Sequence, residues 1–465
     1  MFSKAVVLAL MGIAIASPPA DWQKKSESTG GQEPPSRAAE SLFRTLIPRP
    51  TGRNGYEQYL QAADVVAGSE FVAYMRWRAR RLSETKSGTQ WKDDDNQPIA
   101  PLQTPFGLPS DSSLLDVDRE AARRFANVLE LVKVGNFKTV YHPRDKVSVF
   151  TAMPELQRFR DVARFLSYVA RVRFADGATS GGTDALLQGI RFGINVRCQS
   201  LLHDLVGIAN TAIALAAFEE NLDRLSEQDA ARIEAFASAE LKRPWPFADT
   251  LDRELAWLLD IVEEHLQPGK LKDAVQILGL DESDASTVAA QIEKLSEAEA
   301  AEVRETIKRK LSSFMAPISK RFRGPESGWF IPGETDPFYD GVPATAGKVE
   351  TISHMFLAVL TPSMKNAIGA ELRNRTQLRL LNAHAQIIRY RWRHDVVPRK
   401  ATAAVKPSDL VDPFGGGDYQ YERLDSLRYR LYCRGFGDVG EIELRYKPKR
   451  SPADRDPNDP PIQWP

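Results

Sequence analysis

Apolar side chains recur every three or four residues between positions 56 and 393, a pattern typical of helices that bury one face. Ser226 and Ser296 stand where helix N-caps are expected, and Glu299 completes a capping box at the second. The pattern predicts helices over 56–82, 118–134 and 154–174, a pair within 183–222, one marked by Leu251 to Leu266, and a last long helix over 361–392. We therefore expect a mainly α protein with a multi-helix body.

After Pro398 the helical spacing gives way to alternation. Segments 419–423, 429–433 and 441–446 alternate and are rich in tyrosine, which predicts short antiparallel strands. We expect them to form a small β element packed on the last long helix. Residues 435–440 match Gly-x-Gly-x-x-Gly, but a phosphate-binding loop of this type needs a helix after it. A strand-like segment follows, so we interpret the motif as a hairpin turn.

These patterns divide the chain into a helical body over 54–400 and a small β element over 401–450. The body contains an irregular insertion at 84–116. Residues 17–53 and 451–465 are rich in polar residues, Gly and Pro, so we predict a flexible leader and a disordered tail.

The first 16 residues predict export. Lys4 precedes the apolar run Ala5–Ala16 and small residues follow, which is the pattern of a signal peptide cleaved after Ala16. An uncleaved anchor or a wrongly assigned start are the alternatives. We expect no transmembrane segment in the mature chain, because the longest later apolar run, Leu205–Phe218, has the length of a core helix. The predicted location is periplasmic or extracellular.

Composition narrows the function classes. The 465 residues include 62 Lys+Arg and 62 Asp+Glu, so the formal net charge is zero. This excludes a uniformly basic nucleic-acid-binding protein, and we expect no nucleic-acid partner. The two cysteines exclude a disulfide-rich scaffold and a thiolate zinc cluster. Cys198 and Cys433 are either a disulfide pair or two buried thiols, and we favour the thiols.

The zero net charge conceals an uneven distribution. Residues 211–300 hold 20 acidic and 8 basic side chains, whereas residues 371–450 hold 17 basic and 10 acidic ones. The two regions attract each other within the fold, or the basic end faces an anionic partner.

Few residues indicate chemistry. The sequence contains no His-Glu-x-x-His and no Gly-x-Ser-x-Gly motif, so we assign no catalytic residue, cofactor or metal. The pairs His203–Asp204 and Glu263–His265 are the polar groups from which an unrecognised site in the helical body could be built. Asp93–Asp95 is interpreted as a solvated acidic loop, because Pro98 stands where a calcium loop needs glycine.

Two segments interleave arginine with aromatic residues. Such segments stack on an anionic partner, or they belong to amphipathic helices that bury the aromatic ring under the arginine stems. In the first case we expect an envelope protein or an anionic surface as the partner. The basic and aromatic surface candidates are Arg76, Trp77, Arg78, Arg391, Trp392 and Arg393.

The C-terminal third carries an ordered set of short motifs, which are Leu380-Leu381, Ile388-Arg389-Tyr390-Arg391, Asp412-Pro413-Phe414-Gly415, Tyr419-Gln420-Tyr421 and Leu431-Tyr432. The set resembles the C-terminal element of uncharacterised exported proteins of planctomycete-like bacteria. It is similar, more distantly, to the globular end of type II secretion major pseudopilins. The resemblance implies a small structural module with calcium-ligand candidates at Asp412, Asp418 and Asp438. This chain departs from pseudopilins in having a conventional signal peptide.

The leading functional hypothesis is an exported, non-enzymatic scaffold or binding protein of the envelope or the extracellular space. It follows from the predicted export, the missing catalytic motifs and the resemblance. The alternatives are a hydrolase-like enzyme with an unrecognised site in the helical body, and a pseudopilin-like secretion component.

Overall fold

The computed structural model describes most of the chain and contains twelve α-helices and a three-stranded sheet within that part. The prediction of a mainly α protein with a small C-terminal antiparallel sheet is therefore confirmed. The predicted signal peptide, Asp93–Asp95, Cys198, Asp438 and the C-terminal tail lie outside the described residues. The described residues are 51–87, 103–141, 153–197, 200–244, 246–267, 289–331, 336–338, 346–361, 363–414, 417–435 and 440–446.

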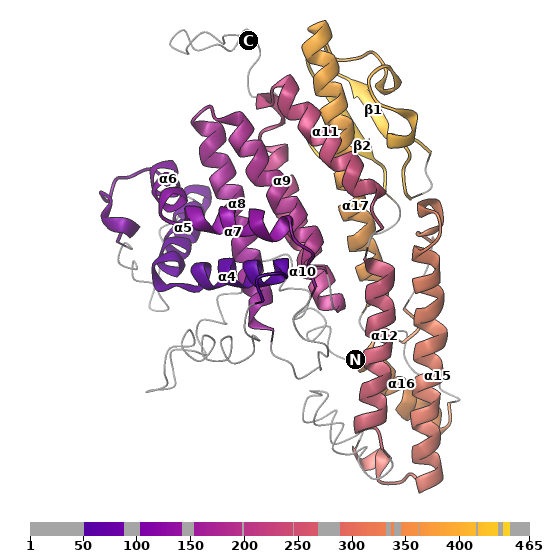
Figure 1. Cartoon of the computed structure of the whole chain (residues 1–465). Coiled ribbons are helices and arrows are strands. Elements are labelled where there is room, and N and C mark those ends of the chain that lie inside the picture. The colour runs from indigo at the N-terminus through magenta and orange to yellow at the C-terminus, as the bar shows by residue number, and fades with distance from the viewer. Residues whose placement is uncertain are drawn as a thin grey trace.

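The helices form a body and an arm (Figure 1). The body contains α4 (Gly55–Ala67), α5 (Ser69–Ser87), α6 (Leu114–Arg124), α7 (Ala126–Asn136), α8 (Pro154–Ala175), α9 (Thr179–Asn195), α10 (Leu201–Glu219) and α11 (Glu227–Lys242). The arm contains α12 (Phe247–His265), α15 (Glu297–Phe322) and α16 (Lys348–Leu360). The long helix α17 (Met364–His394) connects the arm to the sheet. Single 3-10 turns are η1 (Pro105–Gly107), η2 (Leu222–Arg224), η3 (Glu326–Gly328), η4 (Ala401–Ala403) and η5 (Pro407–Asp409).

Aromatic rings hold the N-terminal helices of the body together. Tyr59 of α4 meets Phe192 of α9 edge to face, with ring centroids 4.8 Å apart. Phe159 of α8 contacts Tyr56 in the same way at 5.4 Å. Edge-to-face pairs of this kind add stability beyond the area they bury. The apolar faces predicted from the spacing in α4, α8 and α9 therefore meet in one core.

The most apolar helix, α10, lies inside the body. It packs against α8, α9 and α17, and 67% of its most apolar window is buried. Among the described residues it is the one helix long and apolar enough to cross a membrane. Its burial agrees with the interpretation of Leu205–Phe218 as a core segment.

Both predicted N-caps are confirmed, but two predicted helices are each interrupted. The Ser226 and Ser296 side chains cap α11 and α15, each within a capping box. The helix predicted over 56–82 breaks at Gly68, whose backbone is extended. The helix predicted over 118–134 breaks at Phe125, whose ring packs against those of Phe71 and Phe165. Tertiary packing overrides helix propensity at Phe125.

Glycines permit a close crossing of α9 and α10. A Cβ atom on Gly193 would lie 2.4 Å from Thr211 Oγ1 and 2.8 Å from the Gly207 carbonyl oxygen. A Cβ atom on Gly207 would lie 2.4 Å from the Gly193 carbonyl oxygen. Since backbone atoms cannot move aside without moving the helix, these two positions exclude any side chain.

We expect Gly193→Ala to lower the free energy of unfolding by about 2 kcal/mol, because the added methyl group forces the two helices apart. The matched control is Gly189→Ala on the same face of α9, where the new Cβ atom would lie 3.4 Å from Ala214 Cβ, an ordinary contact. The control is expected to be neutral or slightly stabilising, because alanine favours the helix. Urea unfolding of both variants measures the difference, and equal stabilities would contradict the close crossing.

The sheet has the order β1 (Gln420–Arg423), β2 (Tyr429–Cys433), β3 (Ile442–Glu443), and both pairings are antiparallel. Its inner face packs on α17, where Tyr429 Oη lies 2.7 Å from His384 Nδ1. A strand follows the glycine motif, and a Cβ atom on Gly435 would lie 1.7 Å from the Gly440 carbonyl oxygen. Both glycines have positive φ. The motif therefore lies between two strands that pair antiparallel, as the hairpin interpretation predicts, and its residues 436–439 lie outside the described part of the chain.

Ion pairs connect the acidic and basic regions inside the fold. Glu234 of α11 contacts both Arg389 of α17 and Lys406. Glu227 of the same helix accepts a hydrogen bond from Arg393. Of the two explanations for the uneven charge, attraction within the fold therefore accounts for these residues.

Candidate functional site

Asp204, one of the sequence candidates, belongs to a fully buried ionic network. Arg197 donates to Asp204 through Nε at 2.6 Å and through Nη2 at 3.0 Å. The same Nη2 lies 2.5 Å from Glu371 Oε2 of α17. All three side chains have zero exposure. This network connects the end of α9, the start of α10 and the middle of α17, and it has no access to solvent.

Glu371 is the carboxyl group of this network whose pKa is raised. Burial raises the pKa of Glu371 to about 7, although the Arg197 charge opposes the shift. One guanidinium faces two carboxylates here, so a proton on Glu371 near neutral pH relieves the excess negative charge. Neither Arg197 nor Glu371 was singled out from the sequence, because they lie 174 positions apart.

His203 is also buried, and its ring contacts Ser200 and Tyr56. Ser200 Oγ lies 2.9 Å from His203 Nδ1, and Tyr56 Oη lies 3.4 Å from Nε2. Ser200 is the N-cap of α10 and accepts from the backbone N–H of His203. The serine–histidine contact is therefore part of a helix cap in the core.

Glu254 of α12 is a further buried carboxyl group, and no motif in the sequence pointed to it. Its Oε2 accepts from the backbone N–H of Leu201 at 3.0 Å. Burial raises the pKa of Glu254 to about 7, with the Leu201 hydrogen bond opposing the shift. The group therefore holds a proton over a wider pH range than an exposed glutamate does.

The second sequence candidate, Glu263–His265, lies on the surface of the arm. Glu263 pairs with Lys308 of α15, and its side chain is 44% exposed. His265 is 3.8 Å from Glu264. These contacts belong to an exposed ion-pair cluster, whereas His203 and Asp204 lie in the core. The structure does not bring the two candidate pairs into one site.

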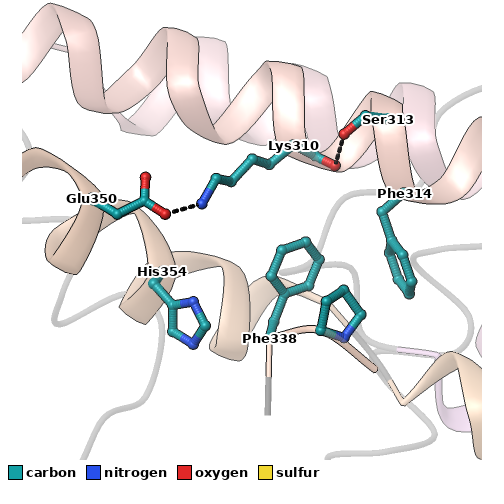
Figure 2. A pocket seen from close by; sticks show the side chains of 7 residues that line it. Lys310, Ser313, Phe314, Phe338, Glu350 and His354 are labelled. Atoms are coloured by element: carbon teal, nitrogen blue, oxygen red, sulfur yellow. Dashed lines mark hydrogen bonds and ion pairs between the residues drawn. The ribbon is translucent and has the colours of Figure 1, made fainter. Parts of the chain in front are cut away.

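A pocket of about 450 Å³ opens between α15 and α16 of the arm (Figure 2). Its apolar wall comes from Phe314, Pro337 and Phe338, and its polar groups come from Lys310, Ser313, Glu350 and His354. The volume lies within the range of small-molecule sites. Sequence reasoning missed these residues, because they come from three separate segments and match no motif.

The polar side chains that line this pocket differ in charge and in exposure to solvent. Lys310 and Glu350 form an ion pair and are 28% and 41% exposed. His354 is only 7% exposed, and its Nε2 has no hydrogen-bond partner among the described residues. Burial lowers the pKa of His354, and the Lys310 charge lowers it further. The imidazole is therefore neutral near pH 7, beside a salt bridge that reaches solvent.

The basic and aromatic candidates do not form one surface. Trp77 and Arg78 are buried rather than exposed, and Arg78 pairs with Asp118 at 2.9 Å. Arg76 is exposed on the same helix. The second group lies at the end of α17, where Arg391 donates to Tyr446 Oη, Trp392 Nε1 donates to the Leu225 carbonyl oxygen, and Arg393 pairs with Glu227.

The calcium-ligand candidates Asp412 and Asp418 do not form a shared site. Asp412 is hydrogen-bonded within the fold, and Asp418 is exposed. Asp412 accepts from the backbone N–H of Phe414 through Oδ1 and from Cys433 Sγ through Oδ2. Asp418 is exposed and bridges to Val411 through its backbone. No group of three acidic, histidine or cysteine side chains in the described part of the chain is arranged to hold a metal ion. Cys433 is a free, buried thiol, and burial raises its pKa above the usual range.

Comparison with known proteins yields no match. No protein-family model, no curated protein and no solved structure is similar enough to this chain to be matched with it. The resemblance of the C-terminal motifs to uncharacterised exported proteins and pseudopilins stays a prediction. The functional argument therefore depends on the chemistry of the residues in this chain.

Proposed function

We propose that this chain is an exported, non-enzymatic binding protein of the cell envelope or the extracellular space. The N-terminal pattern supports export, since a charged start, a short apolar run and small residues precede Ser17. The arm pocket is the observation that carries the binding role. It combines an apolar wall with a few convergent polar groups, as ligand sites do.

The groups around the pocket suit binding better than catalysis. The Ser313 hydroxyl donates to the backbone carbonyl of Lys310 at 3.0 Å, an interaction within its own helix. A nucleophilic serine needs a base in hydrogen-bond contact, and the Ser313 bond goes elsewhere. Lys310 is charged and paired with Glu350, so it is not poised as a nucleophile.

The hydrolase hypothesis started from His203–Asp204 and Glu263–His265. Asp204 is neutralised by a buried guanidinium, and Glu263 is held by an exposed lysine. Neither pair lines the arm pocket. Asp204 and Glu263 are therefore both held in ion pairs outside the arm pocket. Nothing favours the pseudopilin alternative beyond the C-terminal motifs.

A pull-down from envelope extract, with the full mature chain as bait, tests the binding role. We expect a specific partner that stays bound at high salt, because Arg389, Arg393 and Lys406 already pair with acidic residues of α11. Material purified from the exported fraction is expected to begin at Ser17. Recovery of the same proteins by an unrelated exported bait, or an intact N-terminus in the cytosolic fraction, would contradict the proposal.

A further inference from the structure

The arm pocket presents charges of both signs beside aromatic rings. Lys310 lies on α15 and Glu350 on α16, so their ion pair spans the two helices (Figure 2). Phe314 and Phe338 meet edge to face, with ring centroids 5.2 Å apart. The Phe338 ring also lies 6.3 Å from that of His354. A ligand in this space meets an aromatic wall and two opposite charges together.

The Lys310–Glu350 ion pair can be replaced by contacts with a ligand at little cost in stability. Both side chains are partly exposed, and a pair of that type contributes only about 0 to 1 kcal/mol to stability. A ligand that supplies one charge would release one partner and leave the other without compensation. A ligand that supplies both charges replaces one ion pair with two, at no net charge.

The buried imidazole of His354 closes the pocket beside the aromatic wall. His354 is more than nine-tenths buried, and its Nε2 lacks a hydrogen-bond partner in the described part of the chain. His354 lines the same pocket as Lys310 and Glu350.

From these contacts we propose that the pocket binds a small zwitterion with an aromatic side chain, the chemistry of an aromatic amino acid. Its carboxylate pairs with Lys310, its ammonium group pairs with Glu350, and its ring packs against Phe314 and Phe338. The proposal deepens the proposed function, because it names the chemistry of the ligand at the binding site.

Titration calorimetry of the full mature chain with three probes tests this proposal. L-phenylalanine carries both charges, phenylacetate only the carboxylate, and phenethylamine only the ammonium group. We expect L-phenylalanine to bind about tenfold or more tightly than either of the others, because each lacks one charge-assisted bond. Absence of heat with L-phenylalanine, or equal binding of phenylacetate, would overturn the proposal.

Substitutions of the two charged residues test whether L-phenylalanine binds in this pocket. Lys310→Met and Glu350→Gln are each expected to weaken L-phenylalanine binding about tenfold. The matched controls are Lys308→Met and Glu263→Gln, which break an ion pair of similar exposure between α15 and α12 and should leave binding unchanged. Equal losses in both sets would overturn the assignment to this pocket. A specific envelope partner without amino-acid binding would refute this inference and leave the proposed function intact.

Discussion

Replacing Arg197 by methionine is expected to lower the free energy of unfolding by about 3 to 5 kcal/mol, the usual consequence of removing one partner from a buried ion pair. Asp204 and Glu371 would then lie in the core without their guanidinium, and both side chains have zero exposure. Methionine fills a similar volume, so the loss reports the charge rather than a cavity. Urea unfolding near pH 7 measures it.

The control for this prediction is Arg171→Met, which breaks an ion pair with Glu220 whose side chains are 38% and 52% exposed. We expect a loss below about 1 kcal/mol there. Adding Glu371→Gln to Arg197→Met should restore part of the stability, because a glutamine avoids the cost of burying a carboxylate or of protonating it. A double variant less stable than Arg197→Met alone would show that the network does not act through charge.

Replacing Glu254 by glutamine is expected to make the protein more stable at pH 8 by up to about 3 kcal/mol, from 1.36 kcal/mol per pKa unit. Burial raises the pKa of Glu254 from 4.5 to about 7 in the folded state. Between those values the folded state binds more protons than the unfolded one, so stability falls as pH rises. Glutamine cannot ionise, and its amide oxygen can still accept from Leu201.

Unfolding experiments at pH 5 and pH 8 test this. The wild-type protein should lose stability between the two, and Glu254→Gln should lose less. Burial also raises the pKa of Glu371 to about 7. Because Glu371 is still present in the variant, the variant should still lose some stability as the pH rises. The control is Glu263→Gln, since its exposed partner Lys308 lowers the pKa of that carboxyl and no gain at pH 8 is expected. A gain of equal size in the control would refute the assignment to burial.

Features that depend on neighbours in sequence were predictable. The Ser226 and Ser296 caps formed as expected, because a cap needs only the next three residues. The strand at 429–433 followed from the alternation of its side chains. The pattern of His203 and Asp204 also located buried polar residues, although it did not show what lies opposite them.

Features that depend on contacts between distant residues could not be predicted from the sequence. Phe125 interrupts a predicted helix because its ring meets Phe71 and Phe165. Trp77 and Arg78 were predicted as surface candidates, but both are buried, and Arg78 pairs with Asp118. Periodicity identifies a buried face but not the charge or ring that meets it.

The sequence by itself determined the helical body, the helix caps and the strand segments of the C-terminal element, because local propensity and spacing act over a few residues. The tertiary structure alone decided that Arg197 meets Glu371 from 174 positions away, and that Lys310, Phe338 and Glu350 line one pocket. Whether an ionisable side chain is neutralised, protonated or open to a ligand depends on burial and on the charge across from it. Only packing between distant helices sets those two quantities.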